Sequence, residues 1–210
     1  MSKSIARISL IGLILLFAMF IFGLTQLHAA SFAFHAYAHQ TVQRPKVDGG
    51  AECSATAIGP HALLTASHCE RATSHIAIDG IQADVATVLR DEEDHSIYLL
   101  TGISFNTWYA GNIPVDLPLS VGDDVVIFGN PGAFHDMLRR AYVSGSDGPG
   151  PSILFLDGNI NEGDSGAGVF NATGTLLGVI SVKAMGDGIK FSGMYPMKFT
   201  EAQVKQAREF

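Results

Sequence analysis

The sequence predicts an all-β fold, either barrels or a sandwich, and three observations point to it. The chain has 210 residues, 47% of them apolar, and 23 glycines, which suits one turn-rich domain or two small barrels sharing an interface. From Cys53 onward, short apolar runs alternate with turn signals such as Gly59-Pro60, Asp79-Gly80 and Asn130-Pro131-Gly132. Many short strands at regular spacing are typical of barrels and sandwiches.

The expected strands fall into two sets. The first is Ser54–Ile58, Ala62–Ala66, His75–Ile78, Ile81–Arg90 and Ile97–Leu100, and the second is Val125–Phe128, Met137–Ser144, Ile153–Leu156, Ala167–Phe170, Leu176–Val182 and Lys190–Tyr195. Residues 112–124 are rich in Pro, Gly and Asp and are expected to form the linker that crosses between the sets. Thr200 is expected to cap a helix over residues 201–210.

Residues 1–29 have the character of a targeting segment. Lys3 and Arg7 precede an unbroken apolar stretch over residues 8–24, which is long for a signal-peptide core and short for a membrane span. Two alternatives stay open: a signal peptide cleaved after Ala29 or Ala38, or an uncleaved signal anchor that holds the protein in the membrane. Either form predicts export, secreted or periplasmic, with residues 30–50 as a linker or pro-segment.

The net charge of the chain disfavours nucleic acid as a partner. The net charge is −7, and without the first thirty residues 11 basic residues stand against 20 acidic ones, which makes −9. An acidic domain without a basic run is a poor candidate for binding nucleic acid. We expect no cofactor and no metal.

Cys53 and Cys69 are the only cysteines. Export into an oxidising compartment favours a disulfide between them. Two buried thiols are the alternative, and the lack of a second cysteine pair disfavours zinc.

Three strings carry the chemistry: Thr65-Ala66-Ser67-His68-Cys69, the run Asp94–Leu100, and Gly163-Asp164-Ser165-Gly166. A serine hydroxyl becomes a useful nucleophile when an imidazole takes its proton and a carboxylate orients that imidazole. Glycines beside the serine permit a tight turn that aims backbone N–H groups at an oxyanion.

Chain order separates the candidate hydrolase folds. His68 precedes Asp94, which precedes Ser165. An α/β-hydrolase places its histidine after the nucleophile and a subtilisin places its aspartate before the histidine, so neither fits.

These strings resemble those of the chymotrypsin-like serine proteases, which read TAAHC and GDSGGP where this chain has TASHC and GDSGAG. Cys53 stands where the family has the cysteine that pairs with the one after the histidine. Asp94 and its apolar run resemble the family's Asp-Ile-Ala-Leu-Leu segment. Gly178–Ser181 resembles the strand that binds substrate backbone, and Gly193–Tyr195 the strand that closes the specificity pocket.

The resemblance spans residues 51–199 and carries several implications. It implies two six-stranded antiparallel barrels, over about 51–112 and 124–200, followed by the short helix at 201–210. It implies a serine endopeptidase that cleaves polypeptides through an acyl-enzyme, with a triad of His68, Asp94 and Ser165. The oxyanion donors would be the backbone N–H groups of Gly163 and Ser165. A silent double-barrel binding protein and an esterase on the same fold are the alternatives.

The acid of the triad has three candidates in the sequence. Asp91 and Asp84 are alternatives for the acid, and Asp94 is preferred because a strand follows it directly. His95 departs from the apolar residue that the family has there.

The activation string of trypsin-type zymogens is similar to Val47-Asp48-Gly49-Gly50, but this string lies too close to Cys53 to cross the molecule, so we expect a turn. Asp164 is therefore expected to have another partner. In this the chain resembles the compact bacterial HtrA-like branch, whose Ala-Ile-Asn-x-Gly run is similar to Asn159–Gly163.

By the same resemblance, Asn159 and Ile160 would form the base of the specificity pocket, with Ile180, Ser181 and Gly193 as its walls. No aspartate stands at the base, so a small or aliphatic residue is expected before the scissile bond. Ser181 is expected to hydrogen-bond the catalytic aspartate.

Overall fold

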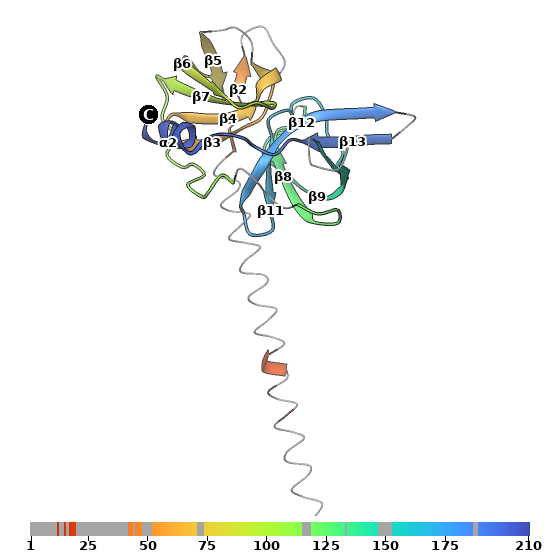
Figure 1. Ribbon diagram of the computed structural model, residues 1–210. Helices are drawn as coiled ribbons and strands as arrows, with labels where there is room; N and C mark the ends of the chain where they lie inside the picture. Colours follow the sequence, from red (N-terminus) through yellow and green to blue (C-terminus); the bar gives the residue numbers. More distant parts are fainter. Residues whose placement is uncertain are drawn as a thin grey trace, which may run out of the picture. The chain divides into compact units, whose positions relative to one another are not determined.

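The computed structural model shows mostly β structure, drawn in Figure 1. It describes residues 12, 15, 17–19, 42–43, 45–47, 52–70, 74–114, 119–132, 134–146, 153–186 and 189–210. The chain divides into two compact units, Met1–Ala36 and Tyr37–Phe210. In the first, residues 12, 15 and 17–19 are helical. No helix in the described ranges has the length and apolar character needed to cross a membrane, and most of residues 8–24 and both predicted cleavage sites lie outside those ranges.

The first half of the second unit is a seven-stranded antiparallel sheet in the order β1-β3-β4-β7-β6-β5-β2. Its strands are β1 (Val42–Gln43), β2 (Pro45–Val47), β3 (Ala55–Gly59), β4 (Ala62–Ala66), β5 (His75–Ile78), β6 (Ile81–Arg90) and β7 (His95–Thr101).

The short segment 42–47 pairs with both edges of this sheet. β1 pairs with β3 and β2 pairs with β5, and only residue 44 separates the two strands. The expected six-stranded barrel is thus a curled sheet of seven strands. The sequence places residues 42–47 in a linker or pro-segment, but they contribute two of the seven strands. They were not predicted because strands of two and three residues are too short to show a period in the sequence. Of the expected turn Val47–Gly50, Val47 is instead the last residue of β2, and residues 48–50 lie outside the described ranges.

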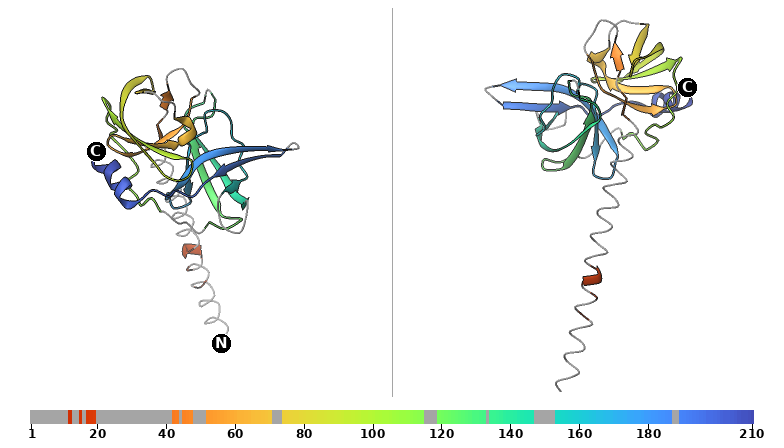
Figure 2. Two further views of the ribbon diagram at one scale, coloured as in Figure 1. Left: turned by 45° about the horizontal axis from the view of Figure 1, so that its top comes forward. Right: turned by 180° about the vertical axis from the view of Figure 1, so that it is seen from behind.

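The second half is a closed barrel in the order β10-β13-β12-β11-β8-β9, and confirms the six-stranded expectation there. Its strands are β8 (Asp124–Gly129), β9 (Met137–Ser146), β10 (Leu154–Leu156), β11 (Gly168–Asn171), β12 (Leu176–Gly186) and β13 (Ile189–Met194). The end of the β12–β13 hairpin projects from the barrel in the views of Figure 2.

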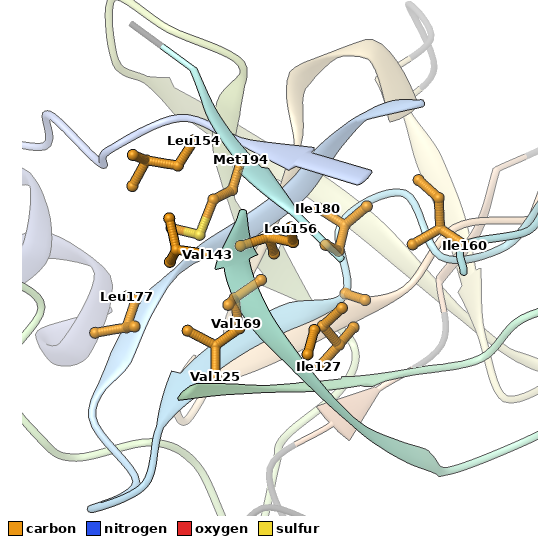
Figure 3. Packing of buried hydrophobic residues seen from close by; sticks show 12 residues of the cluster. Val125, Ile127, Val143, Leu154, Leu156, Ile160, Val169, Leu177, Ile180 and Met194 are labelled. Atoms are coloured by element: carbon orange, nitrogen blue, oxygen red, sulfur yellow. The ribbon is translucent and has the colours of Figure 1, made fainter. Parts of the chain in front are cut away.

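Each half has its own core, because the inward side chains of its strands meet at the middle. Figure 3 shows the core of the barrel; its members include Val125, Ile127, Val143, Leu156, Val169 and Leu177, all buried. The first sheet buries another cluster, which includes Leu63, Ile76, Ile78, Tyr98 and Leu100. The two cores hold the strands, and the loops between strands carry the candidate site.

The C-terminal helix α2 (Glu201–Glu209) confirms the predicted helix. Thr200 caps it: its hydroxyl accepts from the backbone N–H of Gln203, whose side chain accepts from the Thr200 N–H in turn. The helix packs on β3 so closely that a Cβ on Gly59 would lie 2.4 Å from the Ala207 carbonyl oxygen.

Candidate active site

His68 lies on a single 3₁₀ turn, η1 (Ser67–Cys69), that follows β4 directly. Its ring Nδ1 lies 2.7 Å from Asp94 Oδ2, and its backbone N–H donates to Asp94 Oδ1 at 2.9 Å. The Ser67 N–H also donates to the Asp94 carbonyl at 3.1 Å. Of the three candidate acids, Asp94 is therefore the one in contact with His68. Asp84 pairs with the exposed His75, and Asp91 pairs with His95.

The expected disulfide between Cys53 and Cys69 is present, with an S–S distance of 2.06 Å. Both half-cystines are buried. The bond fastens the residue after His68 to the start of the chain that leads into β3.

Ser165 lies in a turn that only glycine can form at two positions. Gly163 has φ +94° and Gly166 has φ +80°, values that strain residues with a Cβ. A Cβ on Gly163 would lie 2.4 Å from the Asn130 carbonyl oxygen, and one on Gly166 would lie 2.2 Å from the Ser54 carbonyl oxygen.

The close packing of Gly166 also brings Ser165 toward the segment that carries His68. A Cβ on Gly166 would be 3.1 Å from the backbone nitrogen of Ala66, two residues before His68. The predicted nucleophile and base therefore lie on neighbouring segments, one from each half of the fold.

Ser54 bonds the turn at residues 163–166, which we call the serine turn, and the sequence did not predict this role. Its N–H donates to the Ser165 carbonyl at 2.8 Å and its hydroxyl donates to the Gly163 carbonyl at 2.7 Å. The hydroxyl also accepts from the Asn130 N–H at 2.8 Å, and the Thr65 hydroxyl donates to the Ser54 carbonyl at 2.8 Å. Ser54 is buried, so water does not compete for these bonds.

Asp164 is fully buried and its carboxylate faces a cation. Arg139, on β9, bonds both carboxylate oxygens, with Nη1 to Oδ2 at 2.9 Å, and also donates to the Asn159 carbonyl at 2.9 Å. The Asn161 N–H completes the set at 2.8 Å. Asp164 thus has the separate partner that we expected, although nothing in the sequence distinguishes Arg139 from its neighbour Arg140.

The predicted pocket residues are only partly on the surface. Asn159 is exposed, whereas Ile160 and Ile180 are buried in the barrel core. Gly193 lies on β13 opposite Phe155. The Ser181 hydroxyl donates to the Val179 carbonyl at 3.4 Å, instead of the expected bond to Asp94.

No group of three or more His, Cys, Asp and Glu side chains is arranged to hold a metal ion within the described part of the chain.

A curled sheet and a closed barrel that bring a Ser-bearing glycine turn beside a His–Asp pair define a chymotrypsin-like protease fold. Comparison with known proteins places the chain further. A family model described as "Trypsin-like peptidase domain" matches residues 53–179. The chain belongs to this family and is a serine endopeptidase.

Solved structures with the same fold are distant in sequence. The Rv3671c protease of M. tuberculosis, in its active form, has a TM-score of 0.63 at 18% identity, over 83% of this chain and 82% of that one. The inactive form gives 0.65 at 17% identity, over 85% and 94%. A serine endoprotease from Yersinia pestis gives 0.61 at 18% identity, over 82% of this chain and 63% of that one. A search of curated proteins finds no match.

Proposed function

We propose that the protein hydrolyses peptide bonds through an acyl-enzyme formed on Ser165, with His68 as general base and Asp94 as its partner. In this mechanism His68 takes the Ser165 hydroxyl proton as the oxygen attacks the substrate carbonyl. It then gives that proton to the leaving amine, and a water molecule repeats the sequence to release the acyl group. Asp94 keeps Nδ1 protonated and stabilises the imidazolium ion.

The observation that carries the proposal is the double contact between His68 and Asp94. One carboxylate oxygen meets the ring Nδ1 at 2.7 Å and the other meets the backbone N–H at 2.9 Å. A carboxylate held at two points fixes both the ring orientation and the tautomer, which leaves Nε2 as the proton acceptor. The His68 side chain is 44% exposed, so a substrate can reach it.

The backbone around Ser165 supports an oxyanion hole at Gly163 and Ser165. Alternate N–H groups in the turn are already used: Asp164 donates to the Asn161 carbonyl at 3.1 Å and Gly166 to the Ile180 carbonyl at 2.8 Å. In the described ranges, the N–H groups of Gly163 and Ser165 donate to no protein acceptor. Two such donors, one on Ser165 itself and one on Gly163, suit the negative oxygen of a tetrahedral intermediate.

The Arg139–Asp164 pair supports activity without zymogen cleavage. Asp164 precedes the nucleophile, and its buried carboxylate is neutralised by a side chain of the same barrel. No newly cut terminus is then needed to hold the turn in its working shape.

The Cys53–Cys69 disulfide supports an oxidising compartment for the domain. Secretion or a periplasmic location, and membrane anchoring through residues 8–24, stay predictions. So does the preference for a small or aliphatic residue before the scissile bond.

The test is labelling of the folded protein with a fluorophosphonate, followed by hydrolysis of casein and of a p-nitrophenyl ester. Wild type should be labelled at Ser165 and should cleave casein. Ser165→Ala should lose labelling and about 10⁶-fold in turnover. Ser67→Ala, which removes a nearby hydroxyl that bonds Ser96, is the matched control and should still be labelled.

Three results would contradict the proposal. Failure of folded wild type to react with the probe indicates a binding protein. Activity of Ser165→Ala near the wild-type level removes the nucleophile assignment. Ester hydrolysis without peptide hydrolysis would instead make the enzyme an esterase.

A further inference from the structure

A second imidazole–carboxylate pair lies beside the proposed triad and is fully buried. His95 Nδ1 lies 2.6 Å from Asp91 Oδ2, and neither side chain has exposed surface. The His68–Asp94 pair is by contrast 44% and 21% exposed. Burying such a pair costs desolvation energy, so its neighbours have to compensate it.

The Asp91 carboxylate joins two segments that are far apart in sequence. We name residues 91–95 the acid turn and residues 198–203 the C-terminal strap. Oδ1 of Asp91 accepts the Glu93 N–H at 2.9 Å within the turn, and Oδ2 also accepts the Lys198 N–H at 2.9 Å from the strap. The Lys198 ammonium donates to Glu93 at 2.6 Å.

Two more contacts fasten the strap to this region. The Phe199 ring packs on the His95 ring at a centroid distance of 6.2 Å. The Gln203 side chain donates to the Arg90 carbonyl at 2.8 Å, immediately before the acid turn. The acid turn is therefore held from outside the first sheet as well as from within it.

The acid turn carries Asp94, whose placement depends on its backbone. Within the described ranges, both Asp94 carboxylate oxygens bond His68 and nothing else in the protein. No further side chain holds the carboxylate, so its position follows from that of residues 91–95.

His95 itself shows that the contact with Asp91 matters. Its Nε2 is buried and has no hydrogen-bond partner among the described residues, which costs free energy that an apolar side chain would not incur. The hydrogen bond from Nδ1 to Asp91 is the contact that an imidazole makes here and an apolar side chain would not.

We propose that Asp91 and His95 are positioning residues of the protease: together they tie the acid turn to the C-terminal strap, and so set the alignment of Asp94 on His68. The proposal rests on the proposed function, because it assigns these residues a role in the alignment of the triad.

The test compares three variants of the full chain. Asp91→Asn removes the charge that accepts hydrogen bonds from His95, Glu93 and Lys198. His95→Leu removes the Nδ1 donor, and His95→Asn keeps an amide N–H at the Nδ1 position. We expect the first two to lose about 10- to 100-fold in kcat with little change in KM. We expect His95→Asn to recover most of the loss.

The pH profile separates alignment from mere stability. A misplaced Asp94 stabilises the His68 imidazolium less. The acid limb of kcat/KM should therefore move to lower pH in Asp91→Asn and His95→Leu. The control is His75→Gln, because His75 and Asp84 form the same kind of pair on the same sheet but are 45% and 65% exposed; its profile should match that of wild type.

The outcomes are decisive at a temperature where the variants being compared are folded. An unmoved limb and unchanged kcat in His95→Leu overturn the positioning role, even when wild type is active. If Asp91→Asn does not fold, the contrast between His95→Leu and His95→Asn decides, and equal activity in those two also overturns it. An inactive wild type that no probe labels refutes the proposed function instead.

Discussion

Replacing Arg139 with methionine is the sharpest test of how the serine turn is held. Methionine keeps an unbranched side chain in place of the aliphatic part of the arginine and removes both bonds to Asp164. Among the residues that the structure describes, the buried Asp164 carboxylate then keeps one donor, the Asn161 N–H at 2.8 Å. Arg139 itself is 21% exposed and Asp164 is not exposed at all.

The magnitude follows from that burial. Removing one partner of a buried ion pair typically costs about 3–5 kcal/mol, because the other charge is left uncompensated. This is a large part of the roughly 5–15 kcal/mol that stabilises a domain. The same loss frees the Asn159 carbonyl from Arg139, so the loop before Ser165 loosens at two points and turnover falls with stability.

Arg140 provides the matched control one residue away. It pairs with Asp124 at 3.3 Å, and both side chains are largely exposed, so Arg140→Met should cost less than about 1 kcal/mol. Urea unfolding gives the free energies, and the rate of fluorophosphonate labelling gives the state of the site. Adding Asp164→Asn to Arg139→Met should restore part of the stability. Equal free energies of unfolding for Arg139→Met and Arg140→Met would refute the reasoning.

Two further predictions concern the acid turn and the disulfide. Replacing Cys53 and Cys69 by serine should lower the free energy of unfolding by about 3 kcal/mol on the loop-entropy estimate, which urea unfolding would show as a lower midpoint. A midpoint equal to that of wild type would show that the cross-link does not constrain the unfolded chain. Burial alone raises the pKa of Asp91, but the hydrogen bond and charge of His95 and the N–H donors of Lys198 and Glu93 outweigh it, so the pKa is lowered. A lowered folded pKa contributes stability that is present above the unfolded pKa of about 3.9 and is lost as pH falls through the folded value. The stability difference between wild type and Asp91→Asn should therefore shrink below about pH 4 in acid titrations of unfolding, and a difference that is constant with pH would contradict it.

The strand boundaries were predictable because the core imposes them. Three strands of the first sheet, β4, β5 and β6, begin and end at the predicted residues, since residues that favour turns, such as Gly59-Pro60 and Asp79-Gly80, separate them. Longer strands such as β12 extend beyond the apolar run into a hairpin that leaves the barrel. The segment 42–47 was not recognised as sheet, because its strands are held by pairing with β3 and β5 and not by a pattern of their own.

The site was predictable only where chemistry restricts residue type. A nucleophile, a base and two glycines at positive φ leave a signature in the sequence. Arg139 and Ser54 act through contacts with residues distant in sequence. An arginine in a strand, or a serine after a cysteine, has no local pattern that predicts such contacts. The Ser181 hydrogen bond to Asp94 was expected from resemblance, whereas the Ser181 hydroxyl donates to the Val179 carbonyl of its own strand.

Ser54 has a consequence for how the protein unfolds. It belongs to the first half of the chain, yet its N–H and hydroxyl are spent on carbonyls of the serine turn in the barrel. If either half opened alone, these buried groups would lose their partners without reaching a new set in the folded remainder. The two halves therefore favour a single cooperative transition, in which the loss of one sheet is also the loss of the other.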